Sequence, residues 1–369
     1  MKICLLSNAL ATHTQRWAKA FAQRGHQVHL LSIRKADIDG VTVHTVNIGP
    51  VNSSSKIWTF LSYLYLLLTA RRIIKKINPD IINAHYAITH GVIAAFANIH
   101  PFVLTVWGSD IIWHRSSKMP KIMEGLIRYS LSRADLICAA SKYLINQTRL
   151  YSPPKAVFEQ TSFGVDCGLF APQADSAAKD SSHLKVGFVK KLTSIYGPDV
   201  LVKAFALVAR QIPDAKLVMA GSGKMLTTLK ELSVELNIAE KIEFTGFIPN
   251  DKVPQLLNTF DVFVNPSTCR ESFGVAVLEA SACGVAVVAT GVGGVPEVCI
   301  DGKTGFLVEP DNPPLLAQAI IKLLQDKQKR TVFGLAGREF VLQQYSWQEC
   351  VNQKLNLFSG LIQKTGKLS

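Results

Sequence analysis

The sequence predicts an α/β protein built from two doubly wound parallel-sheet domains. Short runs of Val, Ile and Leu alternate with longer helical patterns through the whole chain, which is typical of parallel strands covered on both faces. The 369 residues exceed what one hydrophobic core usually serves. Residues 159–183 lose this periodicity and are rich in Ser, Ala and Asp. We therefore place one domain at 1–165, a linker at 166–183 and a second domain at 184–345.

The strands are expected in two series. In the first domain the apolar runs are 2–7, 27–33, 41–46, 80–85, 101–106 and 134–140. In the second they are 184–189, 215–221, 241–246, 261–266 and 285–290. The last helical pattern, within 346–369, has no strand to serve, so we expect it to pack back on the first domain. Ligands of such sheets bind at the carboxyl ends of the strands, where function should be sought.

Charge and cysteine content narrow the class of protein. The formal net charge is +13, and the excess lies in the first half, with 20 Lys and Arg against 10 Asp and Glu in residues 1–182. Such an excess favours an anionic partner, although solubility explains part of it. The seven cysteines are scattered and form no Cys-x-x-Cys pair, which argues against a disulfide framework and for a reducing compartment. We expect a cytoplasmic protein.

Residues 57–70 are rich in Leu, Tyr and Phe and are followed by the basic run RRIIKK. Fourteen apolar-rich residues are fewer than the roughly 20 that span a bilayer as a helix, so we expect no crossing. Two interpretations remain open. Residues 57–76 lie on an anionic membrane surface, at the inner face of the cell membrane, or they form a core helix with a solvated basic end.

The stretch STCRESFGVAVLEASACG, residues 267–284, places two carboxylates in an apolar segment. We expect a loop after a strand, then a helix over 273–283 that Gly284 ends. The first backbone N–H groups of that helix, at Phe273, Gly274 and Val275, would bind an anion. Glu271 and Glu279 would then stand toward either end of a diphosphate and accept hydrogen bonds from a sugar and a ribose. This arrangement predicts a nucleotide-sugar site.

Both glutamates also have simpler explanations. Glu279 could be a glutamate at the edge of the core, paired with a lysine. Glu271 could be an acid that complements the dipole at the start of the helix.

The stretch 267–284 resembles the hallmark of the retaining glycosyltransferases of family 4, which have the GT-B fold of two Rossmann-like domains facing a cleft. The likeness continues through LVMAGSGKMLTTLKEL, KIEFTGFIPNDKVPQLLNTFDVFVNPS and VAVVATGVGGVPEVCIDGKTGFLVEPDNP, and more loosely through RGHQVHLLS, PDIINAHYAITHG, TVWGSDI and SFGVDCGLFAP. It implies transfer of a sugar, with retention, from a UDP- or GDP-sugar to a glycan or lipid-linked acceptor held by the first domain.

The resemblance also implies residue roles on the donor side. Glu271 would contact hydroxyls of the donor sugar and Glu279 the ribose. Lys191 stands where the family has an arginine that binds the diphosphate. The second basic residue of the family falls on Tyr196, so Lys190 is the candidate substitute. With fixed cations at the diphosphate, no metal or other cofactor is expected. Further donor-binding candidates are Gly221, Ser222 and Phe247.

On the first domain, Trp107 occupies the position where the family often has a histidine near the donor sugar. An indole can stack on a sugar but cannot exchange a proton, so Asp110 becomes the candidate catalytic carboxylate, with a helix cap as the alternative. His85 and His90 could line the acceptor pocket or be structural. Thr12, His13 and Thr14 replace a glycine-rich turn, where the threonines could face a ligand or cap the helix.

Several signals favour other functions weakly. Asp37-Ile38-Asp39 spells a metal-binding Asp-x-Asp but lies in a polar turn without further ligands. Glu271 and Glu279 flank an anion site rather than one glycosidic bond, which disfavours a hydrolase. Two rivals remain: a sugar-nucleotide epimerase, which needs proton-transfer groups, and a non-catalytic binder of anionic polymer. No basic platform with interleaved aromatic residues is visible, so nucleic acid is not an expected partner.

Overall fold

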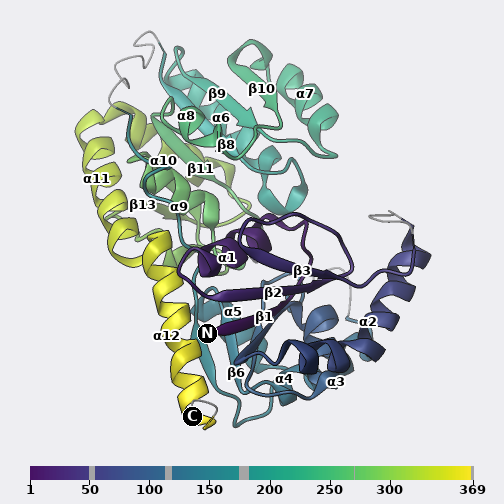
Figure 1. Cartoon of the computed structure of the whole chain (residues 1–369). Coiled ribbons are helices and arrows are strands. Elements are labelled where there is room, and N and C mark those ends of the chain that lie inside the picture. Colours follow the sequence, from purple (N-terminus) through teal and green to yellow (C-terminus); the bar gives the residue numbers. More distant parts are fainter. Residues whose placement is uncertain (50–54, 113–118, 174–182, 270, 367–369) are drawn as a thin grey trace. The chain divides into compact units, whose positions relative to one another are not determined.

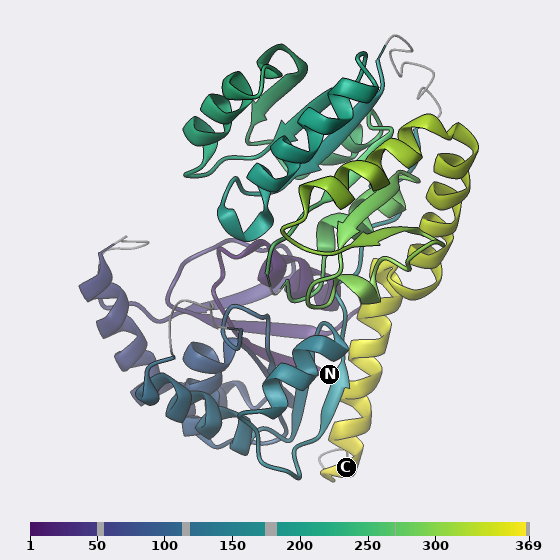
Figure 2. The same ribbon diagram turned by 180° about the vertical axis from the view of Figure 1, so that it is seen from behind.

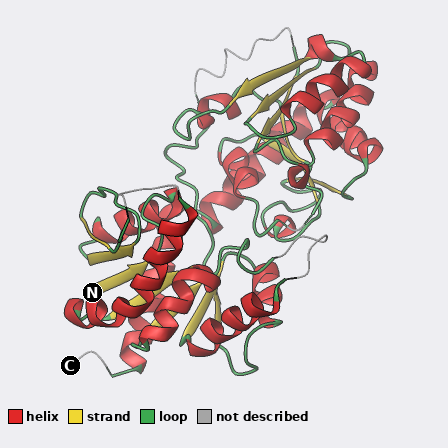
Figure 3. Ribbon diagram, turned by 90° about the vertical axis from the view of Figure 1, so that its right-hand side faces the viewer, coloured by secondary structure: helices red, strands yellow, loops and turns green. Residues whose placement is uncertain are grey.

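The computed structural model describes residues 1–49, 55–112, 119–173, 183–269 and 271–366, and the chain forms two compact units (Figure 1). Unit 1 comprises Met1–Ser162 and Cys350–Ser369, and unit 2 comprises Phe163–Glu349. The described residues 163–173, which we had divided between the first domain and the linker, therefore belong to unit 2. In each unit the strands lie between helices (Figure 3).

Unit 1 is built on a seven-stranded parallel sheet in the order β3-β2-β1-β4-β5-β6-β7. Its core is an apolar cluster from the strands and the helices that cover them. Its elements are β1 (Lys2–Leu6), α1 (Thr12–Ala22), β2 (Gln27–Ser32), β3 (Val41–Thr45), α2 (Lys56–Ile77), β4 (Ile81–His85), a π-helix (Tyr86–His90), α3 (Gly91–Ala97), β5 (Phe102–Thr105), α4 (Lys121–Arg133), β6 (Leu136–Ala139), α5 (Lys142–Arg149) and β7 (Phe158–Gln160).

Unit 2 has a six-stranded parallel sheet in the order β10-β9-β8-β11-β12-β13 with a separate core. Its elements are β8 (Lys185–Val189), α6 (Pro198–Gln211), β9 (Lys216–Ala220), α7 (Leu226–Glu235), β10 (Ile242–Gly246), α8 (Val253–Leu257), β11 (Val262–Asn265), α9 (Val275–Ala282), β12 (Ala286–Thr290), β13 (Gly305–Val308), α10 (Pro313–Gln325), α11 (Lys327–Gln344) and α12 (Trp347–Lys364), with 3-10 turns at Ser194–Tyr196, Ala239–Lys241 and Val295–Glu297. Only the first residues of α12, up to Glu349, belong to unit 2, and the rest of this helix, from Cys350 on, belongs to unit 1.

Helix α2 is longer than its apolar run predicted. It has 22 residues, and by length and composition alone it is long and apolar enough to cross a membrane. The segment is therefore not too short to span a bilayer, and the prediction from its length was wrong. One side of the helix nevertheless packs in the unit 1 core, through Leu66, Ala70, Ile74 and Ile77.

The last helix carries a lysine into the core of unit 1. Lys354 is 1% exposed, its Nζ donates a hydrogen bond to Thr105 Oγ1 at 3.1 Å, and it lies 4.6 Å from the centre of the Trp17 ring. Phe358, one turn further on, packs on Phe21. Figures 1 and 2 both show α12 running beside the strands of unit 1. Burial lowers the pKa of Lys354 from 10.5 to about 8.

This buried lysine predicts that unit 1 becomes more stable as pH rises above about 8. The folded state loses the Lys354 proton near pH 8 and the unfolded state near 10.5, so between these values the unfolded chain binds more protons and unfolding becomes less favourable. The resulting increase in the free energy of unfolding is at most about 3 kcal/mol. Lys354→Met should remove it. Urea unfolding of both proteins between pH 7 and 9.5 measures the difference, and equal pH slopes would contradict the prediction.

Candidate active site

The strand order of unit 2 reverses between β8 and β11, which are neighbours in the sheet although two strands, β9 and β10, lie between them in the chain. In doubly wound sheets, ligands bind in the crevice outside the carboxyl ends of the strands at such a reversal. The two strands pair only at Val262↔Val186 and Phe263↔Gly187. The loops that follow β8 and β11 therefore define the expected ligand site of this unit.

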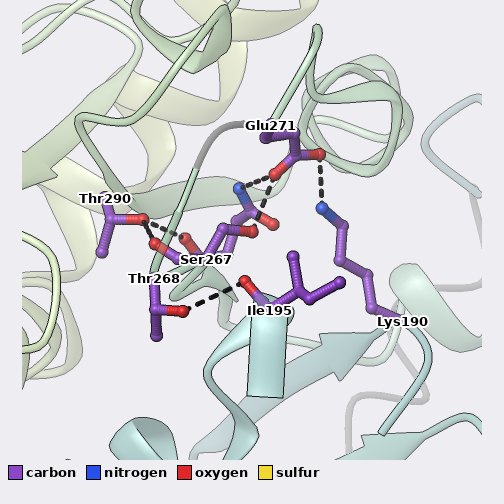
Figure 4. A network of polar contacts seen from close by, with 7 residues as sticks. Lys190, Ile195, Ser267, Thr268, Glu271 and Thr290 are labelled. Carbon is purple, nitrogen blue, oxygen red and sulfur yellow. Dashed lines mark hydrogen bonds and ion pairs between the residues drawn. The ribbon is translucent and has the colours of Figure 1, made fainter. Parts of the chain in front are cut away.

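An ion pair joins these two loops. Lys190, the first residue after β8, donates through Nζ to Glu271 Oε1, and each side chain is 11% exposed. The other oxygen, Oε2, accepts hydrogen bonds from Ser267 Oγ at 2.8 Å and Asn265 Nδ2 at 3.1 Å. Figure 4 shows Lys190 on one side of the carboxylate and Ser267 on the other. Both oxygens of Glu271 are thus held in place.

These contacts decide the charge of Glu271. Burial alone would raise the pKa of its carboxyl group, but the Lys190 ammonium and the hydrogen bonds from Asn265 and Ser267 outweigh burial and hold the pKa below its ordinary value. Glu271 is therefore ionised at neutral pH. A fixed anion with oriented oxygens can accept hydrogen bonds from the hydroxyl groups of a ligand.

Further hydrogen bonds tie the two loops together. Thr268 Oγ1 donates to the carbonyl of Ser194 at 3.0 Å, and Thr290 Oγ1, at the end of β12, donates to the carbonyl of Ser267 at 2.6 Å. Gly197 closes the 3-10 turn with φ +60, and a Cβ there would lie 2.1 Å from the carbonyl oxygen of Pro266. Only glycine allows this approach. We infer that the described residues of these two loops form a rigid site.

The two lysines after β8 have different surroundings. Lys191 is exposed, whereas the Lys190 ammonium lies 4.6 Å from the centre of the Tyr196 ring, in addition to its contact with Glu271. Lys190 is therefore a largely buried cation rather than a solvated residue at the end of a strand. The ammonium of residue 190 lies over residue 196, the position where the resemblance places a basic side chain.

Helix α9 begins later than the sequence indicated. It starts at Val275, with Gly274 as its N-cap at φ +105, and Gly284 ends it at φ +72 as expected. Phe273 lies outside the helix, and its side chain is 1% exposed between Phe163 and Tyr345. Phe273 is thus a core residue, and the first N–H groups of the helix belong to Val275 and its successors. Glu279 lies on α9 and is half-buried.

The turn after β9 holds Gly221 and Ser222, which were predicted to bind the donor. The Gly221 N–H already donates to the Gly246 carbonyl at 2.7 Å, so this amide does not face a nucleotide, and α7 begins only at Leu226. A Cβ on Gly221 would lie 1.9 Å from the Lys190 carbonyl oxygen, and the Ser222 carbonyl accepts the Leu192 N–H. The turn therefore supports the loop of Lys190. Phe247, after β10, is 74% exposed.

In unit 1 the structure corrects the role of Asp110. Its carboxylate is 2% exposed and accepts three backbone N–H groups, those of Trp107 and Gly108 on Oδ1 and that of Ala87 on Oδ2. Asp110 thereby joins the loop after β4 to the loop after β5. It is a positioning residue, and neither a catalytic carboxylate nor a helix cap describes it.

Aromatic rings surround Trp107. His85 and His13 lie 4.9 and 5.1 Å from it between ring centres, and Trp107 is 9% exposed. His85 and His90 are buried, which favours their structural interpretation. His85 Nε2 is 3.3 Å from Asn83 Oδ1.

The helix-capping alternative for the threonines of α1 is wrong. Ala11 is the N-cap and provides no side-chain hydrogen bond. Thr12 is exposed at the first position of the helix, and Thr14 is buried with its Oγ1 2.7 Å from Ser7 Oγ.

Two residues that hold Glu271, Asn265 and Ser267, were not predicted from the sequence. Asn265 ends an otherwise apolar strand, and Ser267 follows two residues later. A buried polar residue at the carboxyl end of a strand is a signal that could have identified both.

Two doubly wound parallel-sheet units are the architecture of GT-B glycosyltransferases, and solved glycosyltransferase structures of this fold match nearly the whole chain. The model of the glycosyl transferases group 1 family matches residues 172–340, and that of the glycosyl transferase 4-like family matches residues 2–141. The chain belongs to the glycosyl transferases group 1, the family-4 type of sugar-transferring enzyme.

Individual relatives agree with this membership. A GDP-mannose-dependent alpha-(1-6)-phosphatidylinositol monomannoside mannosyltransferase of Mycolicibacterium smegmatis is 32% identical over 73% of each chain. The N-acetyl-alpha-D-glucosaminyl L-malate synthase of Bacillus anthracis is 28% identical over 95% of this chain and 94% of that protein. The structure of HepE from Anabaena in complex with UDP and glucose superposes with a TM-score of 0.79 at 22% identity, covering 98% of this chain and all of that one.

Proposed function

We propose that the protein transfers a sugar, with retention of anomeric configuration, from a UDP- or GDP-sugar to a glycan or lipid-linked acceptor. The observation that carries this proposal is the Lys190–Glu271 ion pair at the strand reversal of unit 2. The relatives support the donor class, since one is named for GDP-mannose and another was solved with UDP and glucose. Membership in a family of sugar-transferring enzymes removes the support for the polymer-binder and epimerase rivals.

On the donor side, we assign the diphosphate to Lys190, Lys191 and the first amides of α9. A lysine ammonium has three donors, so Lys190 can keep its bond to Glu271 and still reach a phosphate oxygen. Glu271 accepts hydrogen bonds from the donor sugar, Glu279 binds the ribose, and the exposed Phe247 contacts the nucleotide. Fixed cations and amides stabilise the negative charge of the leaving diphosphate, so the proposed reaction needs no metal.

The proposed reaction is a front-face displacement. The bond between the anomeric carbon and the diphosphate oxygen breaks, and the acceptor oxygen bonds to the same face of that carbon. The acceptor proton passes to the leaving phosphate oxygen. Glu271 takes no part as a nucleophile here, because both of its oxygens are engaged by Lys190, Asn265 and Ser267.

The test of this function uses the purified chain with UDP-glucose, UDP-N-acetylglucosamine and GDP-mannose, each with acceptor glycolipids and free sugars. NMR of the product assigns the new anomeric centre. We expect one donor to be consumed and its configuration retained, and an inverted product would refute the proposed mechanism. Failure to consume any of a full set of UDP- and GDP-sugars would refute the donor class.

We also propose that the protein acts at the inner face of the cell membrane, with α2 as its contact. The outward face of α2 carries large apolar side chains in its first half and basic ones in its second. Ile57, Phe60, Leu64, Tyr65 and Leu68 are 44–71% exposed, and Arg71, Arg72, Lys75 and Lys76 follow on the same helix, all exposed. Since the opposite side packs in the core, the helix would lie in the interface rather than span it.

Membrane binding through α2 predicts that the double substitution Phe60→Glu and Leu68→Glu abolishes binding to anionic vesicles. Two charges would enter the acyl boundary, while the core-facing side of α2 is unchanged. Co-sedimentation with phosphatidylglycerol–phosphatidylethanolamine vesicles measures binding. Lys75→Gln with Lys76→Gln should weaken it by about 2 kcal/mol at low salt. Leu335→Glu, on the equally exposed Leu335 of α11, is the matched control, and an equal loss there would count against α2.

A further inference from the structure

Unit 1 also has a strand reversal, between β1 and β4. The same rule places a ligand crevice outside the carboxyl ends of these two strands. The first residue after β4 is Tyr86, which opens the π-helix Tyr86–His90, and short π-helical turns occur frequently at functional sites. His13, at the second position of α1, follows β1 and is exposed.

The backbone of Tyr86 is strained. Its φ is +72, in the left-handed region that costs an ordinary residue about 1–2 kcal/mol. The other non-glycine residues with positive φ in the described part of the chain are Asn78, Asn98, Asn237 and Asp311, whose side chains tolerate this conformation. Tyrosine has no such tolerance. A strained residue that surrounding contacts hold in place points to a functional constraint.

Two sets of contacts hold Tyr86 in this conformation. Asp110 accepts the N–H of Ala87, the next residue, and the N–H groups of Trp107 and Gly108 in the facing loop. The Tyr86 ring is parallel to the Trp107 indole, with 9° between the planes and 6.1 Å between ring centres. Trp107 is in turn packed by His85 and His13. The buried carboxylate thus sustains an aromatic pair.

The Tyr86–Trp107 pair is not simply part of the hydrophobic core. Tyr86 is 36% exposed although its neighbours His85 and Ala87 are buried, so a left-handed backbone turns a large ring toward solvent. A residue needed only for this turn would be glycine, which adopts φ +72 without strain. The ring itself is therefore the feature that the strain preserves. Aromatic faces bind apolar faces of other rings, and a phenol adds a hydrogen-bonding group.

We propose that Tyr86 and Trp107 form a platform on which unit 1 binds a polyhydroxylated ring of the acceptor, a pyranose or a cyclitol. This inference rests on the proposed transfer function and names its acceptor subsite. The apolar face of the ring lies on Tyr86, and its hydroxyl groups contact the phenol and the His13 imidazole. Tyr86 then determines acceptor affinity, whereas the donor binds to unit 2.

The test compares the wild type with Tyr86→Gly and Tyr86→Asn, which both accept the left-handed backbone but lack the ring. Saturation-transfer NMR with methyl α-mannopyranoside and with myo-inositol, in the presence of UDP or GDP, reports on binding without turnover. We expect signals from one of these probes with the wild type and about tenfold weaker binding with both variants. The melting temperature of Tyr86→Gly should be unchanged or higher, because the strain is relieved.

The control is Asn98→Gly, which makes the same backbone change at an exposed position with φ +51 and should alter neither binding nor melting temperature. Equal probe binding by wild type and variants, or no probe binding by the wild type, overturns the platform. A lower melting temperature in both variants would show that the ring serves stability, and also overturns it. If the wild type consumed no UDP- or GDP-sugar, the proposed function itself would instead be overturned.

Discussion

Replacing Lys190 by alanine is expected to lower kcat/KM about 100- to 1000-fold, the usual cost of one fixed group that stabilises charge in a transition state. Lys190 is the half-buried cation that contacts Glu271, and it would face the diphosphate as negative charge develops. Its removal also leaves Glu271 without its ion partner in a site that is 11% exposed, which should destabilise unit 2 by roughly 3 kcal/mol. Steady-state kinetics with the identified donor measures the activity.

The loss of stability and the loss of catalysis can be separated. In Lys190→Ala with Glu271→Gln no unpaired carboxylate remains, so the melting temperature should recover while activity stays low. Lys203→Ala, at an exposed position of α6, removes an equal charge from the same unit and should leave the rate unchanged. If Lys190→Ala kept more than about a tenth of wild-type kcat/KM, the ion pair would be structural and the assignment of the diphosphate to Lys190 would fail.

The position of the cation gives a second test of the same residue. The Lys190 ammonium lies 4.6 Å from the centre of the Tyr196 ring, so a lysine at position 196 can bring its ammonium to the same place from the neighbouring turn. We therefore expect kcat/KM of the double variant Lys190→Ala with Tyr196→Lys to be about tenfold higher than that of Lys190→Ala alone. Tyr196→Phe, which keeps the ring, should not restore it. Absence of rescue would indicate that an ammonium carried by residue 196 does not replace that of Lys190.

The fold was largely predictable from the sequence because buried parallel strands are recorded as apolar runs. All eleven predicted strands are present, and the two that were missed, β7 and β13, have only three and four residues. Phe158–Gln160 includes a glutamate and overlaps residues 159–183, where the periodicity is lost, and Gly305–Val308 starts with glycine. Short strands at the sheet edge, with few residues buried on both faces, give little periodic signal.

The candidate site was predictable only in part, because residue types and spacings do not show which polar groups are already paired. The sequence indicated Glu271 and the lysines after β8, but not that Lys190 reaches across to the carboxylate. It also suggested a catalytic role for Asp110, whose oxygens in fact hold three backbone N–H groups. The strain at Tyr86 is invisible in the sequence, since tyrosine is not a residue that marks positive φ.

The second large effect is expected from a substitution of Gly293, which packs against the backbone of Glu271. Gly293 has φ +58, and a Cβ there would lie 2.0 Å from the Glu271 carbonyl oxygen and 2.8 Å from its nitrogen. Its neighbour Gly294 donates its N–H to the same carbonyl at 2.9 Å. Gly293→Ala must therefore displace the backbone of Glu271 or break this hydrogen bond. We expect a loss of roughly 3 kcal/mol in unit 2, from backbone strain and overpacking together, and kcat at least about 100-fold lower.

Gly302→Ala separates these two causes, because Gly302 has a similar φ of +69 and nothing within 4 Å of its Cβ position. Gly302→Ala should lower the free energy of unfolding by about 1 kcal/mol, from backbone strain alone, and leave kcat unchanged. Thermal unfolding should then place Gly293→Ala several degrees below Gly302→Ala, since 1 kcal/mol shifts the melting temperature of a domain of this size by roughly 2–4 °C. Equal melting temperatures and equal kcat in the two variants would show that the loop of Glu271 yields without cost, and that the rigidity inferred for the site is absent.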